Sequence, residues 1–149
     1  MVTPAPILRR TVERRVVQAL IGQKLTISTA EAGTVGLVAH RISSVPGASA
    51  CFAGGVVAAH THGWPALALS SAASPGEVAS LLRERLQSTL AVCTCIISSD
   101  DGTMRMALVG PGDLQEWLLG PWSRRPTAYQ LSSQVLSTLD AWFVAAFAS

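Results

Sequence analysis

The succession of a β-branched segment, a turn of small residues and an apolar helical stretch between Leu25 and Ile42 constrains the fold more than any other part of the chain. Leu25-Thr26-Ile27-Ser28 has the composition of a strand, and the apolar residues from Val35 to Ile42 are spaced as in a helix. Residues 30–36 between them read Ala-Glu-Ala-Gly-Thr-Val-Gly. The order predicts a strand–turn–helix unit of an α/β protein.

Four residues of this turn, Glu31, Gly33, Thr34 and Gly36, are the candidate ligand-binding residues. The first turn of a helix carries unpaired backbone N–H groups and the positive end of the helix dipole, and glycine lets a ligand approach the backbone closely. We therefore expect a pocket that holds the phosphate or carboxylate of a small ligand, such as a nucleotide. The alternative is an ordinary strand-to-helix connection that binds nothing.

A second cluster of small residues, at positions 45–58, supplies a family resemblance. Together the two clusters resemble the CinA C-terminal domain, the nicotinamide-nucleotide amidohydrolase family, whose patterns are A-E-S-C-T-G-G and v-P-G-s-S-x-x-f-x-G-G-v-V-a-Y, with a lysine five residues beyond the tyrosine. The chain matches these patterns at Ala30, Glu31, Thr34, Gly36, Pro46, Gly47, Ser49, Phe52, Gly54, Gly55, Val56, Val57 and Ala58. Residues 74–79 are similar to the family's V-S-x-E-V-A helix start. The resemblance covers about the first half of the chain.

The chain departs from the family patterns at the positions of the catalytic side chains. The serine nucleophile corresponds to Ala32, the tyrosine to Ala59 and the lysine to Trp64, and the later T-G-x-A-G-P loop is replaced by residues 97–103. A methyl group cannot attack an amide, and no amine remains to take a proton. The resemblance therefore implies a hydrolase frame without catalytic residues, a non-catalytic ligand-binding or assembly protein, in which the indole of Trp64 fills space that the family leaves for substrate or lysine.

Two alternatives to a non-catalytic family member stay open. Thr34 has a hydroxyl, and His60 or His62 would serve as its base, which would keep the chain an active nicotinamide mononucleotide amidohydrolase with an altered residue set. However, a threonine beside a glycine turn is also a common helix cap. In the second alternative, the chain is an unrelated α/β domain whose turns only mimic the family.

Alternate spacing in His60-Thr61-His62 and Cys93-Thr94-Cys95 raises the question of a metal site. Two imidazoles on one side of an extended segment are too few for zinc, and structural zinc sites usually space their cysteines more widely. Residues 91–97 are typical of a buried strand, in which a free cysteine behaves as a small apolar residue. We expect neither a metal nor a cofactor.

The bulk composition favours a single domain over residues 1–149 that assembles with copies of itself. A chain of 149 residues buries about two thirds of its unfolded surface in one core. Its hydrophobic fraction of 49% and mean hydropathy of +0.39 are high for a soluble monomer, which indicates a homo-oligomer. Three cysteines without a framework spacing fit a reducing compartment, so a cytoplasmic location is expected.

Membrane and nucleic-acid partners are both disfavoured. No window of about twenty residues stays apolar without a charge or a turn breaker. The Arg9-Arg10, Arg14-Arg15 and Arg124-Arg125 doublets belong to a chain with a net charge of only +2 and few interleaved aromatic residues. Such doublets are more typical of a solvated helix face than of a phosphate track.

The remaining segments predict an α/β, single-domain layered sandwich with a mixed β-sheet covered by helices. Pro75 opens a helix with Val78, Leu81, Leu82 and Leu86 facing inward. Residues 91–98 and 103–109 form a hairpin around Asp101-Gly102, residues 113–119 are a short helix or strand, and residues 127–147 form a closing helix. Trp117 and Trp122 are either core residues, which we favour, or surface anchors for a partner.

Overall fold

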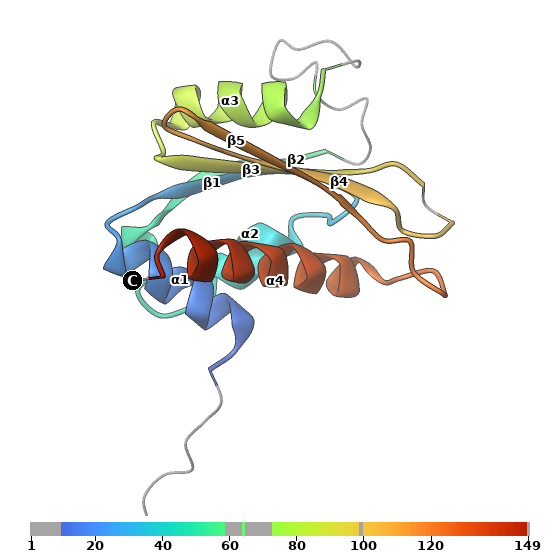
Figure 1. Cartoon of the computed structure of the whole chain (residues 1–149), viewed down its shortest axis with the longest axis horizontal. Helices are drawn as coiled ribbons and strands as arrows, with labels where there is room; N and C mark the ends of the chain where they lie inside the picture. The colour runs from blue at the N-terminus through green and yellow to red at the C-terminus, as the bar shows by residue number, and fades with distance from the viewer. Residues whose placement is uncertain (1–9, 59–63, 65–72, 99, 149) are drawn as a thin grey trace, which may run out of the picture.

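The computed structural model describes residues 10–58, 64, 73–98 and 100–148. Figure 1 shows a β-sheet between two layers of helices. The elements are α1 (Val12–Gly22), β1 (Ile27–Ala32), α2 (Leu37–Ser43), the 3-10 turn η1 (Ala48–Ala50), β2 (Phe52–Ala58), α3 (Pro75–Leu86), β3 (Leu90–Ile96), β4 (Met104–Gly110), β5 (Asp113–Leu119) and α4 (Ala128–Ala146).

The five strands form one mixed sheet in the order β2-β1-β3-β4-β5. β1 runs parallel to β2 and β3, whereas β4 is antiparallel to β3 and β5. Helix α3 covers one face, and α1, α2 and α4 cover the other (Figure 1). The predicted mixed α/β sandwich is confirmed, and it has three layers.

The two faces of the sheet bury cores of different size. The larger core lies against α1, α2 and α4, and includes Leu20, Ile42, Met106 and Leu136. The smaller core lies under α3. Among the described residues it is built mostly from alanine, valine and cysteine, and Trp64 contributes a large ring. Small residues on this face let α3 pack closely on the sheet.

An internal ion pair fixes α2 to the two helices beside it. The guanidinium of Arg41 is 9% exposed, and its Nη2 lies 2.8 Å from Oε2 of Glu13 on α1. Its Nη1 donates to Ser132 and Ser133 of α4, and its Cζ lies 4.3 Å from the centre of the Tyr129 ring. Because a buried cation needs several partners, these contacts determine how α2 lies between α1 and α4.

Most of the predicted elements are confirmed. The helix from Pro75 is α3, the hairpin around Asp101-Gly102 is β3–β4, and the closing helix is α4. The undecided segment at residues 113–119 is a strand, β5. Trp117 and Trp122 are half-buried against the larger core, as the core interpretation predicted.

Two details of the prediction are wrong. The first strand continues to Ala32 instead of ending near Ser28, because β1 pairs along its whole length with β2 and β3. Leu86 is 38% exposed, although it was expected to face inward. It lies beside Gly54 of β2, which is the outermost strand on that side of the sheet in the described part of the chain.

The helices of the described residues include none that is both long enough and apolar enough to cross a bilayer.

Candidate functional site

The predicted site lies at the carboxyl end of β1, beside the ends of its neighbouring parallel strands. Ala32 is the last residue of β1 and pairs with Ala58, the last residue of β2, and with Cys95 near the end of β3. In open α/β sheets, ligands usually bind outside the carboxyl ends of parallel strands, where neighbouring loops diverge. The turn from Gly33 to Gly36 connects the end of β1 to α2.

The backbone of this turn is held in an uncommon conformation. Gly33, Val35 and Gly36 have φ angles of 99°, 51° and 85°. Positive φ is easy for glycine but costly for a β-branched residue such as Val35. A Cβ on Gly33 would lie 2.8 Å from Cβ of Ile96, so the turn also approaches the end of β3 closely. Strained backbone of this kind is concentrated at functional sites.

The carboxylate of Glu31 caps α2 from within the protein. Glu31 is fully buried, and its Oε1 accepts hydrogen bonds from the Thr34 hydroxyl at 2.7 Å and from the Val38 N–H at 2.9 Å. Its Oε2 accepts from the Ala39 N–H at 3.1 Å. Two of the backbone N–H groups that a bound anion would use are therefore bonded to a carboxylate of the chain itself.

Thr34 is held within the same buried network. Its side chain is fully buried, and its Oγ1 lies 3.0 Å from Oγ1 of Thr94 on β3. Its carbonyl oxygen accepts a hydrogen bond from the N–H of Leu37, the first residue of α2. Thr34 therefore holds the turn to β3 and to α2, while its hydroxyl is closed to solvent.

The structure thus brings Glu31 and Thr34 together and places Gly33 and Gly36 in the same turn. Sequence reasoning missed Thr94, the third member of the polar network. The available signal was a lone hydroxyl in the middle of an otherwise apolar strand, since a buried polar side chain needs a hydrogen-bonding partner.

Two of the three positions that the family resemblance assigns to catalytic groups, Ala32 and Trp64, lie on the other side of β1, under α3. Ala32 is fully buried and Trp64 is 2% exposed. Both belong to the smaller core, together with Val78 and Leu82 of α3. The Trp64 indole therefore packs in an apolar cluster with the end of β1.

Ala59, His60 and His62 lie outside the described residues, so the proposed partners of Thr34 are not placed. Cys93 and Cys95 are on β3, where burial raises the pKa of both thiols. Among the residues that the structure describes, no group of three or more His, Cys, Asp or Glu side chains is arranged to hold a metal ion.

Comparison with known proteins shows a similarity to CinA proteins in the first part of the chain. The model of the CinA C-terminal domain matches residues 9–63. A CinA-like protein from Chlorobaculum tepidum is 47% identical over 47 residues, which are 32% of this chain and 11% of that protein. The first part of the chain, residues 9–63, is thus similar to the CinA C-terminal domain. The chain spans about a tenth of the length of this CinA-like relative.

Solved structures of CinA superfamily proteins have the same fold along nearly the whole chain. The Escherichia coli protein superimposes with a TM-score of 0.74 over 98% of this chain and 95% of its own, at 18% identity. The Enterobacter cloacae protein gives a TM-score of 0.73 over 98% of each chain, at 17% identity. At 17–18% identity this similarity establishes that the chain has the fold of these proteins along both of its halves. It does not establish a shared reaction, because one fold can support different functions.

Proposed function

We propose that this CinA-like chain is a non-catalytic binding or assembly protein that has lost the family's hydrolytic groups. The observation that carries the proposal is the burial of Trp64, which is 2% exposed, in one apolar cluster with Ala32. By the family pattern these two positions belong to the lysine and the serine. A cluster of methyl groups and an indole replaces a nucleophile and its base.

The chemistry follows from what the side chains carry. Serine-type amide hydrolysis needs a hydroxyl or thiol, a base that takes its proton and room for the carbonyl beside them. Ala32 and Trp64 supply neither a nucleophile nor a base. Trp64 also occupies volume under α3, so a substrate entering there would have to displace packed apolar groups.

Assembly with copies of the same chain is the role that the surface favours. Large aliphatic side chains are exposed on several elements, including Leu118 at 68%, Val144 at 66% and Leu114 at 52%. Leu114 and Leu118 lie on the same face of β5, the last strand of the sheet in the described residues, and exposed apolar side chains on such a strand favour association with another chain. We propose a homo-oligomer in the cytoplasm, without a nucleic-acid or membrane partner. The free thiols Cys51, Cys93 and Cys95 fit this compartment.

The turn residues Glu31, Gly33, Thr34 and Gly36 remain the proposed ligand-binding set for a nucleotide or phosphate. Since Glu31 already takes the N–H groups of Val38 and Ala39, an anion would have to be held by the backbone of residues 33–36. It would also lie near the Glu31 carboxylate, which weakens anion binding. We therefore favour assembly over phosphate binding as the function of this protein.

A second candidate function is an altered nicotinamide mononucleotide amidohydrolase. It is favoured by one observation, the 2.7 Å hydrogen bond from the Thr34 hydroxyl to the Glu31 carboxylate, which pairs a nucleophile with a base. The complete burial of both residues opposes it, because a substrate carbonyl needs to reach the hydroxyl oxygen.

Ammonia release from nicotinamide mononucleotide separates the two functions. The purified full chain is incubated with the nucleotide beside a CinA-family protein that retains the serine, tyrosine and lysine. We expect ammonia only from the latter. Turnover by this chain that disappears in Thr34→Ala, in a variant that still folds, would establish the second function. Sedimentation velocity then tests assembly, and a single species with the mass of one chain would contradict it.

A further inference from the structure

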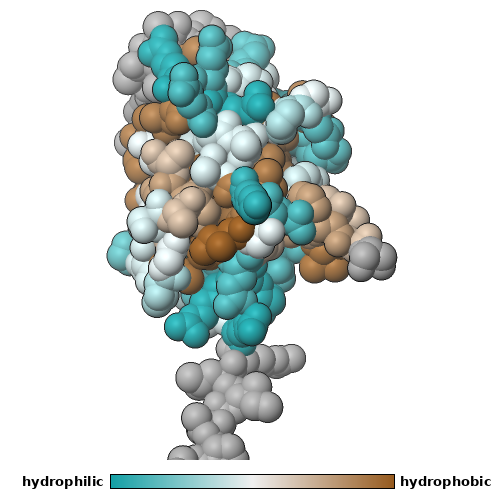
Figure 2. All heavy atoms as spheres, turned by 90° about the vertical axis from the view of Figure 1, so that its left-hand side faces the viewer, coloured by the Kyte–Doolittle hydropathy of each residue, from teal (hydrophilic) through white to brown (hydrophobic). Residues whose placement is uncertain are grey.

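A pocket lies at the end of the sheet where β1 and β3 begin, opposite to the predicted site at the carboxyl end of β1. It is lined by residues from the amino end of β3, the turn between β4 and β5, and the last turns of α4, and its volume is about 200 Å³. Figure 2 views the molecule from this end of the sheet and shows apolar side chains exposed between hydrophilic areas. Because Ala32 lies at the other end of β1, this pocket is separate from the positions that correspond to the family's catalytic groups.

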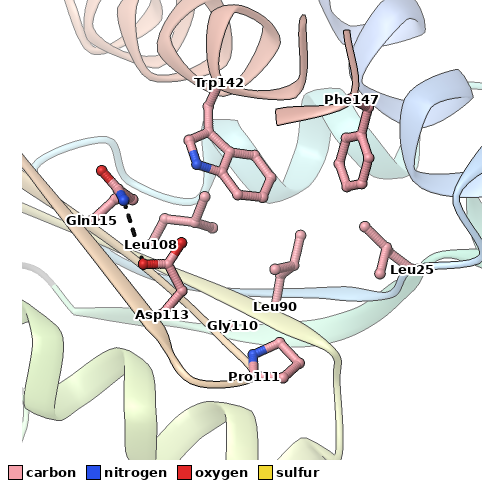
Figure 3. A pocket seen from close by; sticks show the side chains of 9 residues that line it. All are labelled: Leu25, Leu90, Leu108, Gly110, Pro111, Asp113, Gln115, Trp142 and Phe147. Atoms are coloured by element: carbon pink, nitrogen blue, oxygen red, sulfur yellow. Dashed lines mark hydrogen bonds between the residues drawn. The ribbon is translucent and has the colours of Figure 1, made fainter. Parts of the chain in front are cut away.

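The walls of the pocket are two aromatic rings and three leucines. In Figure 3, Trp142 and Phe147 extend from α4 toward Leu25, Leu90 and Leu108, which lie on the opposite wall. Phe147 is 42% exposed, so the pocket opens to solvent beside its ring. A dry apolar cavity of about 150 Å³ accepts benzene, so this volume suits a single aromatic ring with a short substituent.

One end of the pocket is polar. Asp113 and Gln115 are exposed residues of β5, and Nε2 of Gln115 donates to Oδ1 of Asp113 at 3.3 Å. Figure 3 shows this pair and the indole nitrogen of Trp142 at the same end, with Phe147 and Leu25 at the other. The lining carries one negative charge and no positive one.

We propose that this pocket binds a small aromatic amine. The ring would lie between Trp142, Phe147 and the leucines, and the ammonium group would lie at the polar end. There the Asp113 carboxylate is its counterion. The same carboxylate disfavours an acid of equal size, and the volume excludes a nucleotide.

The expected selectivity is modest because the carboxylate is exposed to solvent. An exposed ion pair changes affinity by a few-fold, whereas the burial of the ring supplies most of the binding. We therefore expect an aromatic amine to bind about three- to fivefold more tightly than a neutral alcohol of the same shape.

Three probes of equal ring size test the proposal on the full chain: 2-phenylethylamine, 2-phenylethanol and phenylacetate. The readout is the shift of the tryptophan indole N–H signals in NMR spectra during titration to about 10 mM. Trp142→Phe assigns the relevant signal while keeping the site apolar. We expect the Trp142 signal to shift, with affinity in the order amine, alcohol, acid.

Two variants connect the selectivity to the pocket. Asp113→Asn is expected to reduce the affinity for the amine to that for the alcohol, while Asp100→Asn, which removes the same charge in the turn after β3, leaves the difference unchanged. Phe147→Ala weakens both ligands and, because this ring is partly exposed, is expected to preserve the fold. No Trp142 shift with any probe, equal affinity for amine and alcohol, or a preference that survives Asp113→Asn would each overturn the proposal.

Discussion

The hydroxyl of Thr34 donates to the carboxylate of Glu31 across 2.7 Å, and both residues are fully buried. The same carboxylate accepts the N–H groups of Val38 and Ala39. The turn that would present a catalytic group and an anion-binding helix end to a substrate is thus closed by contacts within the chain. This network stabilises the strand–turn–helix unit in the absence of any ligand.

Glu31→Gln is expected to destabilise the protein by about 1–3 kcal/mol. The amide keeps one acceptor oxygen and replaces the other by a donor, which would face an N–H group or a hydroxyl in a buried site. Urea unfolding measures the free energy. The matched change Glu84→Gln, on the exposed face of α3, should stay within about 0.5 kcal/mol. Equal effects of the two variants would show that the network does not stabilise the turn.

Gly33→Ala is expected to cost about 1–3 kcal/mol of stability. The residue has a φ of 99°, and the new Cβ would lie 2.8 Å from Cβ of Ile96. Gly22→Ala is the control, because a Cβ at that position in α1 has no neighbour within 4 Å. It should be neutral or stabilise by up to about 1 kcal/mol. Thermal unfolding of both variants provides the comparison, and a Gly33→Ala protein as stable as the wild type would contradict the turn geometry.

Trp64→Ala is expected to destabilise the protein by about 3–5 kcal/mol, since it removes a large buried ring from the core under α3. Trp64→Phe should cost less, because part of the volume is retained. Leu118→Ala is the surface control, as that side chain is 68% exposed. Denaturant unfolding gives the three values. A cost for Trp64→Ala as small as that for Leu118→Ala would mean that the indole does not fill this space.

Stability is expected to fall as the pH rises above about 9, in part through Cys93. Burial, and then the neighbouring Cys95, raise the pKa of this thiol above its ordinary value of 9.0. The thiol therefore stays protonated in the folded chain while it ionises in the unfolded chain, so the unfolded state binds fewer protons and the free energy of unfolding decreases with pH. Each such thiol contributes at most about 1.4 kcal/mol per pH unit.

Cys93→Ala isolates this contribution. Every other ionisable side chain is the same in both proteins, so the difference between the two slopes of stability against pH reports on Cys93. The variant should show the shallower decline. Parallel slopes between pH 8 and 10 would contradict the burial of this thiol.

The sequence predicted the local elements well where one physical signal dominated. Pro75 and Ser74 begin α3, the Asp101-Gly102 turn joins β3 to β4, and the spacing of apolar residues defines α4. It failed where the outcome depends on neighbours far away in the chain. β1 continues through residues 29–32 because two strands pair with it, and Leu86 is exposed because it lies beside an edge strand.

The candidate site was predicted in its members but not in their contacts. Glu31, Gly33, Thr34 and Gly36 do share one turn. That the Glu31 carboxylate reaches forward to Val38 and Ala39, and that Thr94 joins from β3, depends on the approach of α2 to the sheet. Sequence spacing does not encode that approach, so an anion-binding helix end and an internally capped one look the same in the sequence.

The most direct test of the central claim is the amount of ammonia that the pure chain releases from nicotinamide mononucleotide during a long incubation at high protein concentration. Because Ala32 and the buried Trp64 carry neither a nucleophile nor a base, we predict fewer ammonia molecules than protein chains after subtraction of the protein-free background. Many turnovers per chain, at a rate proportional to protein concentration, would contradict the claim.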